Sequence, residues 1–157
     1  KKQGAPRPTR TTEGGALAMM VPIKPERIMA KPIEYADASA AVRAVYDDIK
    51  TSRNVPDVNN FWKYLANDPA TLKRTWESVK EVMAKGALDP LTKEMIYLAV
   101  SVSNGCGYCI ASHTASARAK GMTDEQFKEL QAIIAFANAN NRLAAGYQVE
   151  IDERFRT

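Results

Sequence analysis

The sequence has few cysteines and no long apolar run, and each absence excludes a class of protein. Two cysteines in 157 residues are too few for the disulfide framework of a small secreted domain. No apolar run approaches the ~20 residues that a membrane-spanning helix needs, and the N-terminal residues lack the apolar core of a secretion signal. We therefore expect a cytoplasmic protein.

Most of the chain also lacks an excess of charge of either sign. Residues 1–31 carry seven Lys or Arg against two Glu, whereas residues 32–157 carry fifteen Lys or Arg against sixteen Asp or Glu. The net charge of +4 therefore comes from the N-terminal end. The nearly neutral remainder argues against a nucleic-acid partner.

Residues 1–30 have no apolar periodicity and predict an extended basic arm. The chain does not begin with methionine, and Met19 or Met20 could mark the native start, so residues 1–18 are a candidate expression remnant. We expect a neighbouring subunit to order the arm. Residues 31–157 are long enough to form one domain with a substantial hydrophobic core.

Strand patterns are nearly absent, so the prediction is an all-α domain. Only residues 149–155 alternate weakly, whereas apolar residues elsewhere recur at helical spacing. Asp68-Pro69 and Asp89-Pro90 each combine an N-cap with proline at the first helical position. The first expected helix runs from a cap at 37 or 39 to about 50, the second begins after 59 or 60 and ends at about 65, and the third runs from 69 until Gly86. The next two cover 90–104 and 107–120, and the last runs from a capping box at 123–126 to about 146.

Apolar residues one helical turn apart form a stripe on each long helix, and these stripes are expected to face the core. They are Val42, Val45, Tyr46 and Ile49; Leu72, Trp76, Val79 and Met83; Leu91, Met95, Leu98 and Val102; and Leu130, Ile133, Ile134 and Ala137. Trp62 and Trp76 are expected in the core or in subunit contacts.

One short stretch contains the rare, reactive side chains. Cys106, Cys109 and His113 are the only cysteines and histidine of the chain, and they form the pattern Cys-x-x-Cys-x-x-x-His. Two thiols at this spacing can close a small disulfide loop. A helix N-terminus favours the reactive thiolate over the thiol, whose free pKa is about 8.5. His113 shares a helix face with Cys109 and can accept its proton.

Glu94 is the candidate acid that holds His113 in place. If the helices over 90–104 and 107–120 fold back on each other, Glu94 lies about eleven residues before the turn and His113 eight after it. At about 1.5 Å per residue their depths differ by only about 5 Å, which one water could bridge. The neighbouring side chains that could line the same pocket are Tyr97, Ser103, Tyr108 and Ser112.

The cysteine pair has other interpretations as well. Buried cysteines can be purely structural. A zinc site would need a carboxylate or water as fourth ligand, because the chain offers only two cysteines and one histidine. A c-type haem is excluded, since Ile110 rather than histidine follows the second cysteine. We favour a redox dithiol with no bound metal or cofactor.

The pattern Glu-x(11)-Cys-x-x-Cys-x-x-x-His resembles the signature of the alkylhydroperoxidase D (AhpD)-like branch of the carboxymuconolactone decarboxylase superfamily. The similarity covers most of the chain from about residue 33 and includes the motifs at 67–70, 88–94 and 141–143. The residues that match functional positions of the family are Glu94, Cys106, Cys109 and His113. Some members carry a second histidine directly before the second cysteine, where this chain has Tyr108.

The resemblance implies an all-helical, oligomeric enzyme that reduces hydroperoxides or relays electrons to a peroxiredoxin, with a dithiol or lipoyl-bearing protein as reductant. Cys109, which has His113 one turn ahead, is expected to attack the peroxide and Cys106 to resolve the product. Ile96 lies off the apolar stripe of its helix, which also favours a homo-oligomer. Two alternatives stay open: a lactone decarboxylase, which does not use this cysteine pair, and a non-catalytic redox-sensing or oligomerisation module.

Overall fold

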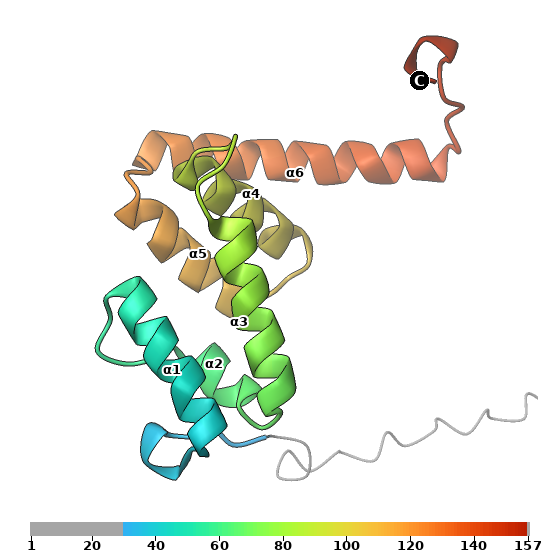
Figure 1. Cartoon of the computed structure of the whole chain (residues 1–157). Helices are drawn as coiled ribbons and strands as arrows, with labels where there is room; N and C mark the ends of the chain where they lie inside the picture. The colour runs from blue at the N-terminus through green and yellow to red at the C-terminus, as the bar shows by residue number, and fades with distance from the viewer. Residues whose placement is uncertain (1–29, 157) are drawn as a thin grey trace, which may run out of the picture.

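The computed structural model describes residues 30–156, and this part of the chain is helical, without β-strands (Figure 1). The all-α prediction is therefore confirmed. The predicted N-terminal arm, with its candidate remnant, lies outside the described residues except for residue 30. The helices are α1 (Ala40–Arg53), α2 (Asn60–Leu65), α3 (Pro69–Met83), α4 (Pro90–Ser103), α5 (Gly107–Ala119) and α6 (Asp124–Gly146), with 3-10 turns η2 (Tyr35–Asp37) and η3 (Glu153–Phe155).

Side-chain caps begin the helices where the sequence predicts them. Asp68 accepts hydrogen bonds from two backbone N–H groups at the start of α3, and Asp89 does the same at the start of α4. Thr123 and Gln126 form the predicted reciprocal capping box at the start of α6. Each cap satisfies N–H groups that have no partner within the helix, and loss of one typically costs about 1 kcal/mol.

The helices bury two hydrophobic clusters. The N-terminal cluster joins α1, α2 and α3, and its buried residues are Ala38, Val42, Tyr46, Ile49, Val58, Trp62, Ala66, Leu72 and Trp76. The C-terminal cluster joins α4, α5 and α6, and its buried residues are Leu98, Ala117, Met122, Leu130 and Ile134. The two tryptophans lie edge to face with ring centroids 5.5 Å apart, so their predicted place in the core is confirmed.

Two predicted elements differ from the structure. Helix α3 ends at Met83 rather than near Gly86, because Lys93 of α4 donates hydrogen bonds to the carbonyls of Val82 and Ala84 and so satisfies the last turn. The weak strand candidate over 149–155 is not a strand but leads into the 3-10 turn η3. A segment without a partner strand has nothing to bond its backbone groups in a sheet.

The predicted core face of α6 is half wrong. Leu130 and Ile134 are buried, but Ile133 is 57% exposed and Ala137 is also exposed. Ile133 is turned by about 100° around the helix axis from Ile134, so it lies at the edge of the face that α6 packs on α4.

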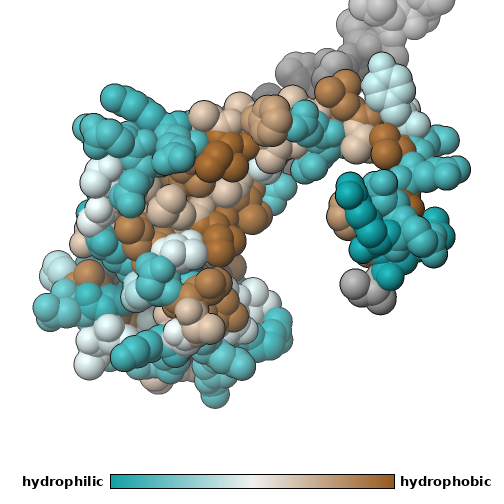
Figure 2. All heavy atoms as spheres, turned by 90° about the horizontal axis from the view of Figure 1, so that it is seen from above, coloured by the Kyte–Doolittle hydropathy of each residue, from teal (hydrophilic) through white to brown (hydrophobic). Residues whose placement is uncertain are grey.

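Large apolar side chains remain at the surface of α3, α4 and α6, and Figure 2 shows such side chains among polar ones in the view from above. On these three helices they are Val82, Ile96, Tyr97, Val100, Ile133, Phe136 and Leu143. None of the helices described between residues 30 and 156 is long and apolar enough to cross a membrane.

Candidate active site

The turn between α4 and α5 fixes the first cysteine. Gly105 adopts a left-handed conformation with φ 69°, which a glycine reaches without the penalty of a side chain. The N–H of Gly105 bonds the carbonyl of Val102, and the N–H of Cys106 bonds the carbonyl of Ser101 at 3.0 Å. This pair of bonds is the Schellman ending of a helix, and it ties Cys106 to the last turn of α4.

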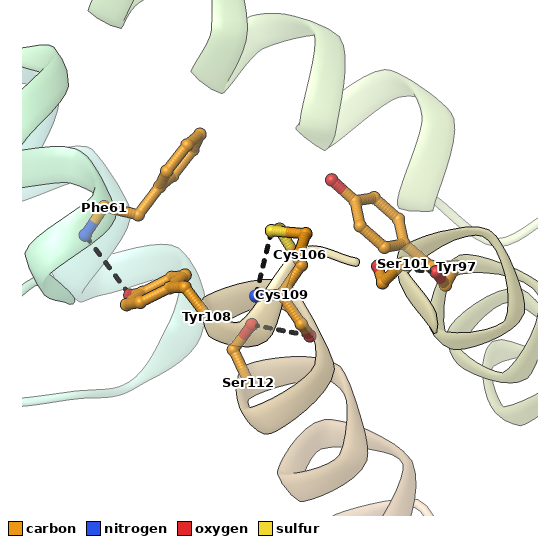
Figure 3. The surroundings of a disulfide bond; sticks show 7 residues. All are labelled: Phe61, Tyr97, Ser101, Cys106, Tyr108, Cys109 and Ser112. Carbon is orange, nitrogen blue, oxygen red and sulfur yellow. Dashed lines mark hydrogen bonds between the residues drawn. A yellow bond between two sulfur atoms is a disulfide. The ribbon is translucent and has the colours of Figure 1, made fainter. Parts of the chain in front are cut away.

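Cys106 and Cys109 form a disulfide at the start of α5, with their Cα atoms 5.3 Å apart. Cys106 is the N-cap of α5, and its Sγ accepts a hydrogen bond of 3.3 Å from the N–H of Cys109. Figure 3 shows the disulfide between Phe61 and Tyr108 on one side and Tyr97 on the other. The sulfurs thus stand at the positive end of a helix and between aromatic side chains.

Glu94 and His113 contact each other directly. Nδ1 of His113 lies 2.7 Å from Oε2 of Glu94, and Nζ of Lys120 lies 2.9 Å from Oε1. The predicted pairing of Glu94 with His113 is therefore present, but without the bridging water that the helix depths suggested. A glutamate side chain reaches far enough to close a difference of about 5 Å along the helix axis.

The two partners of Glu94 keep it charged. Burial of this carboxyl, which is 5% exposed, acts to raise its pKa, but the hydrogen bonds to His113 and Lys120 outweigh burial and hold the pKa below its ordinary value of 4.5. An ionised carboxylate only accepts hydrogen bonds, so Nδ1 of His113 carries a proton. The other ring nitrogen, Nε2, is then the one that can accept a proton.

Tyr97 covers one face of the His113 ring. The two ring centroids are 3.6 Å apart and the planes differ by 20°. This stacking, together with the bond from Nδ1 to Glu94, restricts the imidazole to one orientation. A histidine held in this way can transfer protons in a defined direction.

A cleft of about 710 Å³ brings most of the predicted site residues together. Glu94, Cys109 and His113 line it, as do three of the expected neighbours, Tyr97, Tyr108 and Ser112. Cys106 instead lines an adjoining apolar groove, which Cys109 and Tyr97 share. Ser103 lies in neither, because it accepts a hydrogen bond from Asn138 of α6.

Lys120 and Arg53 are among the residues of the cleft that were not predicted from the sequence. Lys120 follows His113 by seven residues, which is two helical turns, so the spacing could have placed both on the face that meets Glu94. Arg53 lines the same cleft from the end of α1. No local pattern signals Arg53, because its position depends on how α1 packs against α3.

The described residues contain no group of three or more His, Cys, Asp and Glu side chains that could hold a metal ion. The two cysteines are bonded to each other, and Nδ1 of the single histidine is bonded to Glu94.

Comparison with known proteins finds a family model and several similar proteins that agree with one another. A model of the carboxymuconolactone decarboxylase family matches residues 69–149. Alkyl hydroperoxide reductase AhpD of Solibacter usitatus is 30% identical over 140 residues, which span 87% of this chain and 75% of that protein. A protein of the same name from Anaeromyxobacter dehalogenans is 28% identical over 130 residues, or 80% of this chain and 69% of that protein.

A solved structure is also similar. The crystal structure of the alkylhydroperoxidase AhpD core from Rhodospirillum rubrum matches with a TM-score of 0.79 and 53% sequence identity, over 83% of this chain and 98% of that one. The family model covers more than half of the chain. The chain therefore belongs to the carboxymuconolactone decarboxylase family, in its AhpD-like branch.

Proposed function

We propose that the protein is a thiol-dependent peroxidase that reduces organic hydroperoxides through Cys106 and Cys109. The observation that carries the proposal is the Glu94–His113 pair, joined at 2.7 Å, in the same cleft as Cys109. The names of the AhpD relatives support the same activity. A lactone decarboxylase is the weaker alternative, because that chemistry does not use the cysteine pair.

The first step is activation of Cys109. In the reduced protein, Nε2 of His113 takes the thiol proton, and ionised Glu94 stabilises the imidazolium that forms. Lys120 keeps Glu94 ionised through its bond to the second carboxylate oxygen. The Cys109 thiolate then attacks the outer oxygen of the hydroperoxide, the O–O bond breaks, and the proton on His113 passes to the departing alkoxide. The products are an alcohol and a sulfenic acid on Cys109.

The second step forms the disulfide. The Cys106 sulfur attacks the Cys109 sulfur, the hydroxyl leaves as water with the proton of Cys106, and the S–S bond forms. Cys106 suits this role because the N–H of Cys109 and the start of α5 stabilise its thiolate. An external dithiol then returns two electrons and two protons by exchange and is itself oxidised to a disulfide. A dithiol or a lipoyl-type donor is the proposed reductant, and a peroxiredoxin is a proposed partner.

Either sulfur could be the one that attacks the peroxide, and two features of the site favour different cysteines. A helix N-cap alone would favour Cys106 as the nucleophile, because its thiolate is the better stabilised. The proton path favours Cys109, since Glu94 and His113 line the cleft with Cys109 and not the groove with Cys106. We assign attack to Cys109 because a nucleophile also needs an acid to protonate the leaving alkoxide.

Peroxide turnover with a dithiol reductant tests the proposed function. The wild-type protein is expected to consume many equivalents of an alkyl hydroperoxide, and Cys106→Ser and Cys109→Ser are each expected to lose sustained turnover. Ser103→Ala, which removes a hydroxyl that lies in neither the cleft nor the groove, serves as the matched control. A wild-type protein that consumes one equivalent and stops would instead be a redox sensor.

A sulfenic-acid probe tests which sulfur attacks. Cys106→Ser is expected to accumulate a labelled sulfenic acid on Cys109 after one equivalent of peroxide, while Cys109→Ser stays unlabelled. Rapid labelling of Cys106 in Cys109→Ser would reverse the assignment.

A homo-oligomer is part of the proposal. Ile96 and Val100 line the apolar groove beside Cys106, and Ile133 and Phe136 are exposed on α6. A second copy would cover such side chains, since patches of this kind on soluble proteins commonly mark interfaces.

A further inference from the structure

The cleft beside Cys109 contains more positive than negative charge. Its lining includes the cations Arg53, Lys80 and Lys120 but a single carboxylate, that of Glu94. Lys120 is paired with Glu94, and Lys80 is paired at 2.6 Å with Asp48, which lies outside the lining. Among residues 30–156, the Arg53 guanidinium has no hydrogen-bond or ion-pair partner, so these residues leave one positive charge of the cleft without a paired carboxylate.

Two tryptophans position the Arg53 guanidinium. Its central carbon lies 5.4 Å from the ring centroid of Trp62 and 5.1 Å from that of Trp76, within the range of cation–π contacts. Both rings are buried, so the surface on which Arg53 rests is rigid. Arg53 as a whole residue is exposed, so a ligand can reach it, and partial burial beside the rings lowers the pKa of Arg53, although the nearby Glu94 and Tyr108 partly offset it. An arginine stays charged in these surroundings.

The rest of the cleft wall is largely apolar. Phe61 and Tyr108 stack with ring centroids 6.3 Å apart, and Val79 and Met83 of α3 also line the cleft. The volume of about 710 Å³ is within the usual range for sites that bind small molecules. A ligand that fills this space therefore needs an apolar body and one negative group.

We propose that Arg53 binds the carboxylate of an aliphatic substrate whose other part extends to Cys109. A guanidinium matches a carboxylate with two parallel hydrogen bonds. The single uncompensated charge fits a monoanionic carboxylate better than a phosphate dianion. The inference rests on the proposed function only in naming the reactive group: the carboxylate belongs either to the hydroperoxide or to the dithiol reductant.

Binding to the oxidised protein tests the site without any turnover. Octanoate and octan-1-ol share a chain length and differ in charge, and both are titrated by calorimetry, with the fluorescence of Trp62 and Trp76 as a second signal. Octanoate is expected to bind wild type at least tenfold more tightly than it binds Arg53→Gln. Its affinity for Arg53→Lys should lie between these two, and the affinity for octan-1-ol should be the same in all three proteins. The exposed Arg142→Gln is the matched control and should behave as wild type. Equal octanoate affinity in wild type and Arg53→Gln would overturn the inference.

The two half-reactions identify the source of the carboxylate. A fatty-acid hydroperoxide is compared with its methyl ester in the oxidation of the reduced protein, and dihydrolipoate with dihydrolipoamide in its reduction. Arg53→Gln is expected to raise the KM of the acid roughly tenfold or more in one of these pairs while its neutral partner is unaffected. Normal turnover with no such selectivity in either pair would overturn the inference and leave the peroxidase intact. Selective octanoate binding without any peroxide turnover would support the carboxylate site and overturn the proposed peroxidase function.

Discussion

The two hydrophobic clusters differ in how completely the chain covers them. The N-terminal cluster encloses both tryptophans and Tyr46 almost entirely, whereas α4 and α6 leave large apolar side chains in water, with Phe136 70% exposed. The ion pairs around Glu94 and the disulfide also belong to the C-terminal half. Under the proposed function, the N-terminal half supplies a self-sufficient core and one wall of the cleft, and the C-terminal half supplies the reactive side chains and the surface for assembly.

Leu72 and Leu98 allow the largest test of this contrast, because both are 0% exposed and each lies in one cluster. Replacement of either by alanine is expected to lower the free energy of unfolding by about 2–5 kcal/mol, as measured by denaturant titration. Leu98→Ala should also slow peroxide reduction per folded molecule, because Leu98 lies on α4 one turn from Glu94. Leu72→Ala should not. Equal effects on the rate would contradict a division of roles between the halves.

The proton relay gives the next largest effect. His113→Ala and Glu94→Gln are each expected to slow peroxide reduction roughly 10- to 1000-fold, the scale of a lost acid–base group, while circular dichroism shows the helices intact. Glu129→Gln, an exposed change on α6, is the control. If either relay variant reduced peroxide at the wild-type rate, the substituted residue would have only a structural role.

Assembly is the third test, because the exposed apolar face belongs to the C-terminal half. Wild type is expected to sediment as a homo-oligomer at micromolar concentration. Phe136→Glu should weaken association at least tenfold, about 1.4 kcal/mol, since it introduces a charge into an apolar contact. Asn141→Glu adds the same charge to an exposed polar position on another side of α6 and should have little effect. A wild-type monomer would show that the C-terminal half needs no partner.

The smallest expected effect is a pH dependence of stability. The pKa of Glu94 is depressed in the folded protein, so the stabilisation from its ion pairs is present above the ordinary value of 4.5 and is lost as pH falls through the folded pKa. The difference in unfolding free energy between wild type and Glu94→Gln should therefore shrink as the pH falls below about 4.5. If the difference in unfolding free energy stays the same down to pH 3, the pKa of Glu94 in the folded protein is not below its ordinary value.

Local signals predicted the helix starts well. Asp68, Asp89 and Thr123 cap their own helices, so the few residues around each one contain the needed information. The Glu94–His113 pair was also predictable, because one tight turn sets the relative depth of two adjoining helices. The prediction of a bridging water was wrong, because the difference in depth along the two helices takes no account of the length of the glutamate side chain.

Features that depend on how distant helices pack could not be predicted in this way. The rotation of α6 decides that Ile134 is buried and Ile133 is exposed, yet both are isoleucines on one helix. Arg53 enters the cleft only because α1 packs against α3 and the two tryptophans support it. The helix end at Met83 depends on a lysine of the next helix.

Tyr108, which lies between the two cysteines, reaches out of the C-terminal half. Its hydroxyl accepts a hydrogen bond of 3.2 Å from the backbone N–H of Phe61 in the first turn of α2, where Asn59 makes no side-chain cap (Figure 3). Any rearrangement of the loop from Cys106 to Cys109 during the redox cycle changes the surroundings of that N–H. The amide resonance of Phe61 in a nuclear magnetic resonance spectrum therefore reports the oxidation state of the cysteine pair from a helix that contains no sulfur.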